Sequence, residues 1–204
     1  MSAEAPVVDL VFELEGDTLP ADYAYALYRA VARVLPWLES EPGAGIHPLK
    51  GAATDRGTLL LSRRSRLILR LPAARAPEAE RLTGEVLDIG GAPLRVGPAR
   101  VKELMPFATL YARFVTTGSG EEQDFLRDVA ALLDGLGTRC KFMCGKSREA
   151  RLGEGEIRGY SVMLHEVLLE ESLALQRQGL GGARMLGCGM LVPHKSIRAV
   201  RREE

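Results

Sequence analysis

The sequence lacks the features that mark membrane-spanning and disulfide-stabilised proteins. It has only three cysteines among 204 residues, and no apolar run approaches the roughly 18 residues that a membrane-spanning helix needs. The first residues, MSAEAPVVDL, show no basic segment followed by a long apolar one, so they do not indicate an export signal. An odd number of cysteines also argues against a disulfide framework. We therefore expect free thiols, no membrane partner and a cytoplasmic protein.

A net charge is also missing, because 27 basic residues balance 27 acidic ones. The charges are nonetheless segregated. Residues 1–41 contain eight acidic and two basic residues, whereas residues 56–70 and 172–202 contain five and six basic residues and no acidic one. Local basic segments neutralise phosphate groups whatever the total charge is. A nucleic-acid partner therefore stays open, although GC-biased codon usage would also enrich arginine without explaining the clusters.

Nucleotide-binding motifs are absent too. No G-x-x-x-x-G-K-[ST] loop occurs, and the glycine-rich stretch GLGGARMLGCG (179–189) has Arg184 where the dinucleotide motif needs glycine. It follows an expected helix and enters an expected strand, the reverse of a Rossmann loop. Two interpretations remain. Either its amides and Arg184 meet phosphate oxygens, or Gly179 caps a helix and Gly187 and Gly189 mark a bulged strand.

Hydrophobic periodicity predicts the same order of elements twice. In the first half we expect a strand at 7–14, a helix at 22–38, a hairpin of 58–62 and 65–71, a helix at 76–83 and short strands up to 104. In the second half we expect a strand at 107–117, a helix at 121–137, a hairpin of 139–146 and 157–167, a helix at 169–178 and a strand at 185–193. Strand, helix, hairpin, helix, strand is the ferredoxin-like pattern. The prediction is an α+β protein of two tandem ferredoxin-like (RRM-like) domains, residues 1–105 and 106–204, with antiparallel sheets and helices on one face.

The C-terminal glycines resemble those of a known family. G-x-G-(x5)-G-x-G between a helix and a short strand is similar to the glycine-rich signature of the CRISPR-associated endoribonucleases, which cut precursor guide RNA within its repeats. Gly179, Gly181, Gly187 and Gly189 match the glycines of that signature, and Arg184 matches its basic position. DYAYALYRAVARVLPWLE and GIHPLKG resemble a compact subfamily of about this length, so the resemblance covers essentially the whole chain.

RNA can be cleaved without a metal ion when its own 2'-hydroxyl attacks the phosphorus. The reaction needs a base for that hydroxyl, an acid for the leaving 5'-oxygen and cations near the phosphate. Histidine titrates closest to neutral pH, and the chain has only His47, His165 and His194. His47 lies in the long loop 42–57, where the resemblance also implies the general acid or base. The alternative for His47 is a hydrogen bond to the backbone; His165, between apolar residues, is expected to be structural, and His194 could contact RNA.

Two more side chains are candidates for the chemistry. Lys50, three residues after His47, suits the stabilisation of charge on the reacting phosphate, although alone it would be a surface lysine. The resemblance implies a tyrosine on the first helix, which offers Tyr23, Tyr25 and Tyr28. Helical projection puts Tyr28 at the edge of the apolar stripe and favours it. Its alternative is partial burial with the hydroxyl in water.

Other hydrolytic chemistries find little support. Cys140 and Cys144 are spaced C-x3-C in an expected strand and lack the tight spacing of a zinc knuckle. The acidic residues are scattered on helix faces instead of forming a two-metal cluster, and no G-x-S-x-G motif occurs. We therefore expect no metal and no cofactor.

Together with these residues, the resemblance implies a metal-independent endoribonuclease that binds and cleaves CRISPR repeat RNA and leaves a 2',3'-cyclic phosphate. The resemblance implies precursor guide RNA as substrate and subunits of a CRISPR effector complex as partners. The predicted RNA-binding residues are Arg63, Arg64, Arg66, Gly179, Gly181, Gly182, Arg184, Gly187, Gly189, Lys195 and Arg198. The alternatives are a non-catalytic RNA-binding subunit with the same fold, and a small-molecule enzyme that binds a phosphorylated ligand at the glycine-rich stretch.

Overall fold

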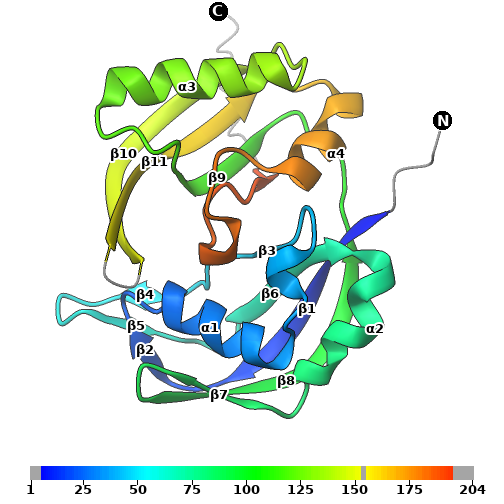
Figure 1. The fold of residues 1–204 in the computed structure, drawn as a ribbon, viewed down its shortest axis with the longest axis vertical. Helices are drawn as coiled ribbons and strands as arrows, with labels where there is room; N and C mark the ends of the chain where they lie inside the picture. Colours follow the sequence, from blue (N-terminus) through cyan, green and yellow to red (C-terminus); the bar gives the residue numbers. More distant parts are fainter. Residues whose placement is uncertain (1–5, 153–154, 195–204) are drawn as a thin grey trace, which may run out of the picture.

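The computed structural model describes residues 6–152 and 155–194 and contains two antiparallel units in tandem (Figure 1). The first unit comprises β1 (Val7–Glu15), α1 (Ala24–Val34), β3 (Gly45–Ile46), β6 (Arg66–Pro72), α2 (Ala76–Ala79), β7 (Val86–Ile89) and β8 (Ala92–Glu103). Its sheet has the order β3-β6-β1-β8-β7. Strands β1, β3, β6 and β8 are the four principal strands of a ferredoxin-like fold. As in that fold, the first of them, β1, lies between the third, β6, and the fourth, β8.

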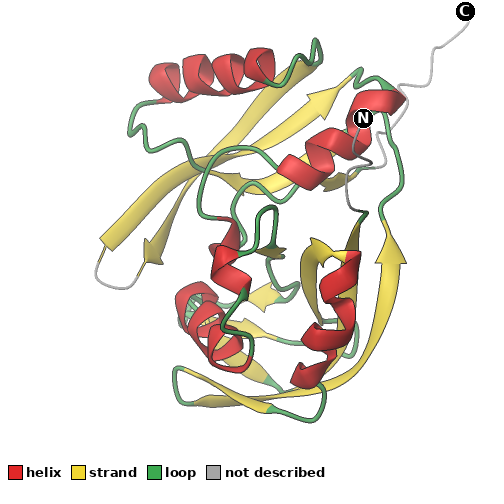
Figure 2. Ribbon diagram, turned by 45° about the vertical axis from the view of Figure 1, so that its right-hand side comes forward, coloured by secondary structure: helices red, strands yellow, loops and turns green. Residues whose placement is uncertain are grey.

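The second unit repeats this arrangement. It comprises β9 (Leu110–Val115), α3 (Glu122–Gly135), β10 (Lys141–Leu152), β11 (Gly155–His165), α4 (Leu169–Gln178) and β12 (Val192–Pro193). Its sheet has the order β10-β11-β9-β12, and Figure 2 shows the long strands of this sheet in yellow below a red helix at the top of the view. The predicted α+β fold with two tandem ferredoxin-like units is confirmed, while the division at residue 105 stays a prediction. In the described part of the chain, no helix is both long and apolar enough to cross a membrane.

Strand β1 shows how the first sheet separates its core from its other face. Val8, Leu10 and Phe12 are buried in the core that α1 and α2 share with this sheet. Because side chains alternate along a strand, Asp9 and Glu13 lie on the opposite face. Helix α1 supplies Leu27, Ala30 and Val31 to the core. The sheet face that points away from these helices is thus the one that carries charged groups.

The predicted hairpin of residues 58–62 and 65–71 is wrong. Strand β5 (Thr58–Leu60) pairs with β2 (Thr18–Pro20) and β4 (Ala52–Ala53) in a separate three-stranded sheet. Strand β6 instead pairs with β1 along one edge and with β3 along the other. Both edges of β6 are therefore occupied, and β5 has no edge of it to join.

The predicted strand at 185–193 is also wrong for most of its length. Residues Arg184–Leu186 form a single 3-10 turn, and only Val192–Pro193 pair as a strand, with β9. Gly187 and Gly189 have φ angles of 83° and 66°. These left-handed conformations interrupt an extended backbone, so the chain stays irregular until it reaches β12.

Candidate active site between the two units

His47 lies in a segment that is fixed on both sides. Just before it, β3 pairs with β6, and the His47 amide donates to the Ile68 carbonyl at 2.9 Å. Just after it, the Leu49 amide donates to the Tyr23 hydroxyl at 2.7 Å. The His47 side chain is buried, with only 6% of the residue exposed. The loop predicted from the sequence is therefore an ordered segment.

A pocket of about 440 Å³ opens beside His47, and both units line it. The first unit contributes His47 and four cationic residues, namely Lys50, Arg64, Arg66 and Lys102. The second unit contributes Gln176, Val192 and Pro193. Histidine and several cations thus share one cavity, which is the combination that phosphate chemistry needs.

The bend at residues 62–65, which carries Arg63 and Arg64, is hydrogen-bonded to the segment that carries Lys50. The Ser65 hydroxyl donates to the Lys50 carbonyl at 2.6 Å, and it accepts a hydrogen bond from the Ser62 amide at 3.0 Å. Arg66 donates from Nη1 to the carbonyls of Arg63 and Ser65, each at 2.7 Å. These bonds bring the bend beside Lys50, although the two segments are distant in sequence.

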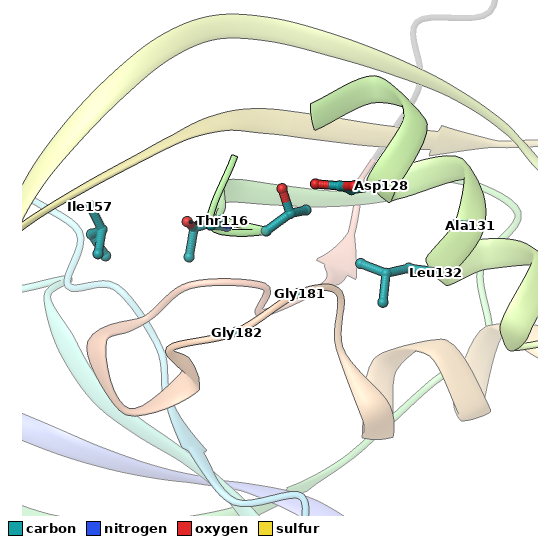
Figure 3. Close-up of a pocket in the computed structure, with 9 residues that line it drawn as sticks. Thr116, Asp128, Ala131, Leu132, Ile157, Gly181 and Gly182 are labelled. Atoms are coloured by element: carbon teal, nitrogen blue, oxygen red, sulfur yellow. Dashed lines mark hydrogen bonds between the residues drawn. The ribbon is translucent and has the colours of Figure 1, made fainter. Parts of the chain in front are cut away.

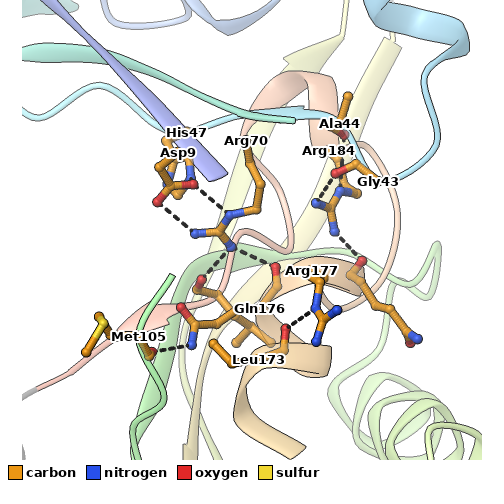
Figure 4. A network of polar contacts seen from close by, with 12 residues as sticks. Asp9, Gly43, Ala44, His47, Arg70, Met105, Leu173, Gln176, Arg177 and Arg184 are labelled. Carbon is orange, nitrogen blue, oxygen red and sulfur yellow. Dashed lines mark hydrogen bonds and ion pairs between the residues drawn. The ribbon is translucent and has the colours of Figure 1, made fainter. Parts of the chain in front are cut away.

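Three buried side chains form an ionic network beside the pocket (Figure 4). Arg70, with no exposed surface, donates to both oxygens of Asp9, from Nε at 2.8 Å and from Nη2 at 3.0 Å. His47 Nε2 lies 3.2 Å from Asp9 Oδ1. Arg70 Nη1 reaches into the second unit, where it donates to the carbonyls of Gln176 at 2.7 Å and Leu191 at 2.9 Å.

This network controls the charge of its members. Hydrogen bonds from His47 and Arg70, together with the Arg70 charge, outweigh burial and hold the pKa of Asp9 well below its usual range. For His47, burial is the largest influence and lowers the pKa; Arg70 and Arg184 lower it further, and Asp9 opposes them. His47 is therefore neutral near pH 7.

The glycine-rich segment, residues 179–189, packs directly on the His47 segment. The Arg184 guanidinium donates to the carbonyls of Gly43 at 2.7 Å and Ala44 at 3.2 Å, and to that of Gln178. A Cβ atom on Gly187 would lie 3.0 Å from the Pro48 side chain. Arg184 is thus occupied by backbone carbonyls that precede His47, a role that sequence reasoning did not anticipate.

Several glycines of this segment are explained by close packing. A Cβ atom on Gly181 would lie 2.3 Å from the Thr116 carbonyl oxygen, and one on Gly189 would lie 2.2 Å from that of Leu180. The Gly182 amide donates to Thr116, and the Gly189 amide donates to Phe114. Gly179, at φ 72°, ends α4. The close backbone approach expected from the glycines occurs within the chain itself, and contact of the glycines with RNA stays a prediction.

The remaining predicted residues are dispersed. Tyr28 is absent from the described residues that line the His47 pocket; its ring lies 6.2 Å from that of Tyr25, and burial, followed by a hydrogen bond with Glu39, raises its pKa. Arg63 is exposed at the bend beside Arg64. The predicted Lys195 and Arg198 lie outside the described residues.

Sequence reasoning missed three residues of this region, Asp9, Arg70 and Lys102, and it considered Tyr23 but favoured Tyr28. Asp9 and Arg70 each interrupt an apolar strand, a signal that was available in VVDLV and LILRL. The cross-strand register then pairs Asp9 with Arg70 on one side and with Lys102 on the other. That register depends on pairing between distant segments, so the sequence alone did not indicate it.

A larger cavity, of about 670 Å³, lies between α3 and the glycine-rich segment (Figure 3). Its lining includes Thr116, Ala131, Leu132 and Gly182. Asp128 is the single ionisable side chain among the described residues that line it, and hydrogen bonds from Ser119 and Thr117 lower its pKa. A carboxylate without a cation disfavours phosphate, so the smaller pocket at His47 is the better candidate.

The structure also places the other candidate ligands. Within residues 6–152 and 155–194, no group of three or more His, Cys, Asp or Glu side chains could hold a metal ion. All three cysteines are free thiols, as predicted. The His194 ring lies 5.6 Å from the Tyr111 ring, and the Nε2 atom of His165 is buried without a hydrogen-bond partner in the described part of the chain.

The fold and the pocket define a class: a protein of two tandem ferredoxin-like units with a histidine and several cations placed between them for phosphate chemistry. The comparisons with known proteins identify its family. The family model described as Cas6 Crispr matches residues 8–196. The chain is 33% identical over 187 residues to the CRISPR-associated endonuclease Cas6 of Myxococcus xanthus (strain DK1622), covering 91% of this chain and 81% of that relative. This chain therefore belongs to the Cas6 family.

Solved structures agree in fold. A CRISPR associated protein Cas6 superimposes with a TM-score of 0.68 at 12% identity, covering 93% of this chain and all of the other. A protein titled "An RAMP protein binding different RNA substrates" gives a TM-score of 0.60 at 18% identity, covering 90% of this chain and 98% of the other. At these identities the likeness establishes the fold, and the sequence relationship establishes the family.

Proposed function

We propose that this protein is an endoribonuclease that binds and cleaves CRISPR repeat RNA to generate guide RNAs. The observation that carries the proposal is His47, which lines a pocket with Lys50, Arg64, Arg66 and Lys102 at the junction of the two units. The relative from Myxococcus xanthus, named as a CRISPR-associated endonuclease, supports the same activity. The pocket therefore combines a proton-transfer group with the charge that a phosphodiester requires.

The proposed reaction is attack of a 2'-hydroxyl on the adjacent phosphorus. The bond from phosphorus to the 5'-oxygen breaks, and the products are a 2',3'-cyclic phosphate and a 5'-hydroxyl. His47 exchanges a proton with the reacting oxygens, which a neutral imidazole can do as a base near pH 7. Lys50 stabilises the charge that develops on the phosphate oxygens. Every step uses side chains of this chain and RNA alone.

RNA binding is proposed to extend beyond the pocket. Arg63 and Arg64 are exposed on the bend beside the pocket. Lys102, on strand β8 next to β1, adds a cation to the pocket lining. Such residues neutralise phosphates without reading bases, so affinity is expected to fall steeply as salt rises. Lys195 and Arg198 remain candidates for the same role. Subunits of a CRISPR effector complex remain candidate partners, and the cytoplasmic location remains a prediction.

Single-turnover cleavage tests the proposal. Excess protein is incubated with repeat RNA in EDTA, and the product ends are analysed for a cyclic phosphate. We expect cleavage at one position, and a fall of about 10²- to 10⁴-fold in rate for His47→Gln with RNA affinity little changed. Binding without cleavage by the wild-type protein would instead favour the non-catalytic RNA-binding subunit. Unchanged cleavage by His47→Gln would remove His47 from the mechanism.

A further inference from the structure

Asp9 is a buried acid in a strand that is otherwise apolar at its centre. Only 7% of the residue is exposed. Its neighbours Val8 and Leu10 point into the core with α1, so Asp9 points to the opposite face, on which the His47 pocket lies. Directly opposite residues of paired strands point to the same face. Arg70 on β6 and Lys102 on β8 therefore flank Asp9 on either side.

The Arg70 hydrogen bonds fix the ionisation and the orientation of this carboxyl. A forked pair of bonds from one guanidinium to both carboxylate oxygens is geometrically specific and favours the charged form. The remaining Arg70 nitrogen is held by two carbonyls of the second unit. Neither Asp9 nor Arg70 can rotate without losing several bonds, so the carboxylate is presented to His47 in one orientation.

An ionised carboxylate can only accept hydrogen bonds, and a neutral imidazole carries one hydrogen, on one of its two nitrogens. Because Nε2 is the nitrogen 3.2 Å from Asp9 Oδ1, the hydrogen must be on Nε2. The other nitrogen, Nδ1, then has its lone pair available. The charges facing His47 are Asp9 from β1, Arg70 from β6 and Arg184 from the glycine-rich segment, and Lys50, Lys102 and Glu103 line the same pocket.

We propose that Asp9 is a positioning residue that fixes the His47 tautomer with its proton on Nε2, so that proton exchange with the RNA takes place at Nδ1. This role rests on the proposed function, although the tautomer itself does not. Asp9 also balances the neighbouring cations when His47 becomes an imidazolium after accepting a proton. In Asp9→Asn the charge is lost and the amide presents one oxygen and one NH₂ group. Nothing then compels the His47 proton to stay on Nε2.

The first test measures the tautomer without RNA. In protein labelled with ¹⁵N-histidine, two-bond ¹H–¹⁵N correlation spectra distinguish a protonated ring nitrogen from a bare one, and His47→Gln identifies the His47 signals. We expect a protonated Nε2 and a bare Nδ1 in the wild type at pH 7, and a mixed or reversed pattern in Asp9→Asn. A protonated Nδ1 in the wild type overturns the proposal. This measurement also stands if Asp9→Asn does not fold.

The second test measures catalysis. We expect Asp9→Asn to lower the single-turnover rate by about 10²-fold or more, the direction known for carboxylates that orient a catalytic histidine, and to shift the pH–rate profile while RNA affinity stays within about 3-fold. Glu13→Gln, an exposed acid on the same face of β1, is the matched control and should keep the wild-type rate. In the His47→Gln background, Asp9→Asn should cause little further loss, because it acts through His47.

The outcomes separate the two proposals. A wild-type rate and profile for folded Asp9→Asn overturn the positioning role while cleavage by the wild type still supports the proposed function. A wild-type protein that binds but does not cleave repeat RNA overturns the proposed function, while the NMR pattern still decides the tautomer. Additive losses in the double variant would place Asp9 in a role independent of His47, and so contradict the proposal.

Discussion

Four strands have the same order in both units, β3-β6-β1-β8 in the first and β10-β11-β9-β12 in the second, but the connection between the first two strands of each row differs. In the second unit, β10 and β11 pair from Lys141–His165 to Leu152–Gly155, with one irregularity along the way. In the first unit, β3 has only two residues, and residues 47–65 leave the sheet before β6 begins. The excursion carries His47, Lys50 and Arg64. The candidate active site thus occupies the place where a ferredoxin-like hairpin has been opened.

The segment around His47 and the hairpin β10–β11 are stabilised by different contacts. The continuous hairpin β10–β11 is held by its own backbone ladder. Residues 43–49 are held instead by Tyr23, which immediately precedes α1, by Arg184 and Gly187 of the second unit, and by pairing with β6. The glycine-rich segment therefore supports the candidate site of the first unit as well as the fold of the second.

The largest effect is expected at the buried arginine that joins the units. Arg70→Leu leaves Asp9 buried without its cation and removes both bonds to the second unit. We expect the free energy of unfolding to fall by about 3–5 kcal/mol, measured by urea denaturation. Arg148→Leu, which changes an exposed arginine on β10, should stay within about 0.5 kcal/mol. A loss below about 1 kcal/mol for Arg70→Leu would contradict the importance of this junction.

Two adjacent glycines test whether packing explains the glycine-rich segment. Gly181 has a φ of 77° and no room for a Cβ atom, whereas a Cβ atom on Gly182 would meet nothing within 4 Å and its φ is not in the left-handed range. Gly181→Ala should lower the free energy of unfolding by about 1–3 kcal/mol. Gly182→Ala should change it little. Thermal unfolding of the two variants provides the measurement, and equal effects would refute the explanation.

The buried histidine predicts a pH dependence of stability. Because the folded-state pKa of His47 is lowered from its ordinary value of 6.5, the unfolded chain binds a proton more readily. The free energy of unfolding therefore has its full value above pH 6.5, where His47 is neutral in both states, and falls as the pH drops below 6.5, where the unfolded chain takes up the proton. We expect a slope of up to about 1.4 kcal/mol per pH unit. Denaturation of the wild type and of His47→Gln between pH 7.5 and 5 should show this slope only in the wild type.

The smallest effect concerns the tyrosine that holds the opened segment. Tyr23→Phe removes the acceptor of the Leu49 amide and should cost about 1 kcal/mol of unfolding free energy. Tyr28→Phe is the matched control: Tyr28 lies in α1, five residues after Tyr23, and is not among the described residues that line the pocket, so this change should have little effect on stability or cleavage. A larger loss of cleavage for Tyr28→Phe than for Tyr23→Phe would support the prediction that Tyr28 assists catalysis.

Much of the fold could be predicted because it depends on local pattern. The alternation around Val8, Leu10 and Phe12 indicated β1, and the boundaries of α4 (Leu169–Gln178) were predicted to the residue. The hairpin of 58–62 and 65–71 failed because both segments are rich in apolar residues, and a local apolar pattern predicts a strand without indicating which strand it pairs with. Strand 185–193 failed because left-handed glycines decided its conformation.

The two ferredoxin-like units, the segregation of charge and the family signature could all be read from the amino-acid sequence, which also indicated His47 and Lys50 as candidates. The contact of Asp9 with His47, the bonds of Arg70 to the second unit and those of Arg184 to the carbonyls of Gly43 and Ala44 became visible only in the folded structure. The two groups of features differ in the sequence separation of the residues that interact. Periodicity and turn chemistry act between near neighbours, whereas these contacts join residues separated by 38 to 141 positions. Their partners are set by strand register and by the packing of one unit on the other.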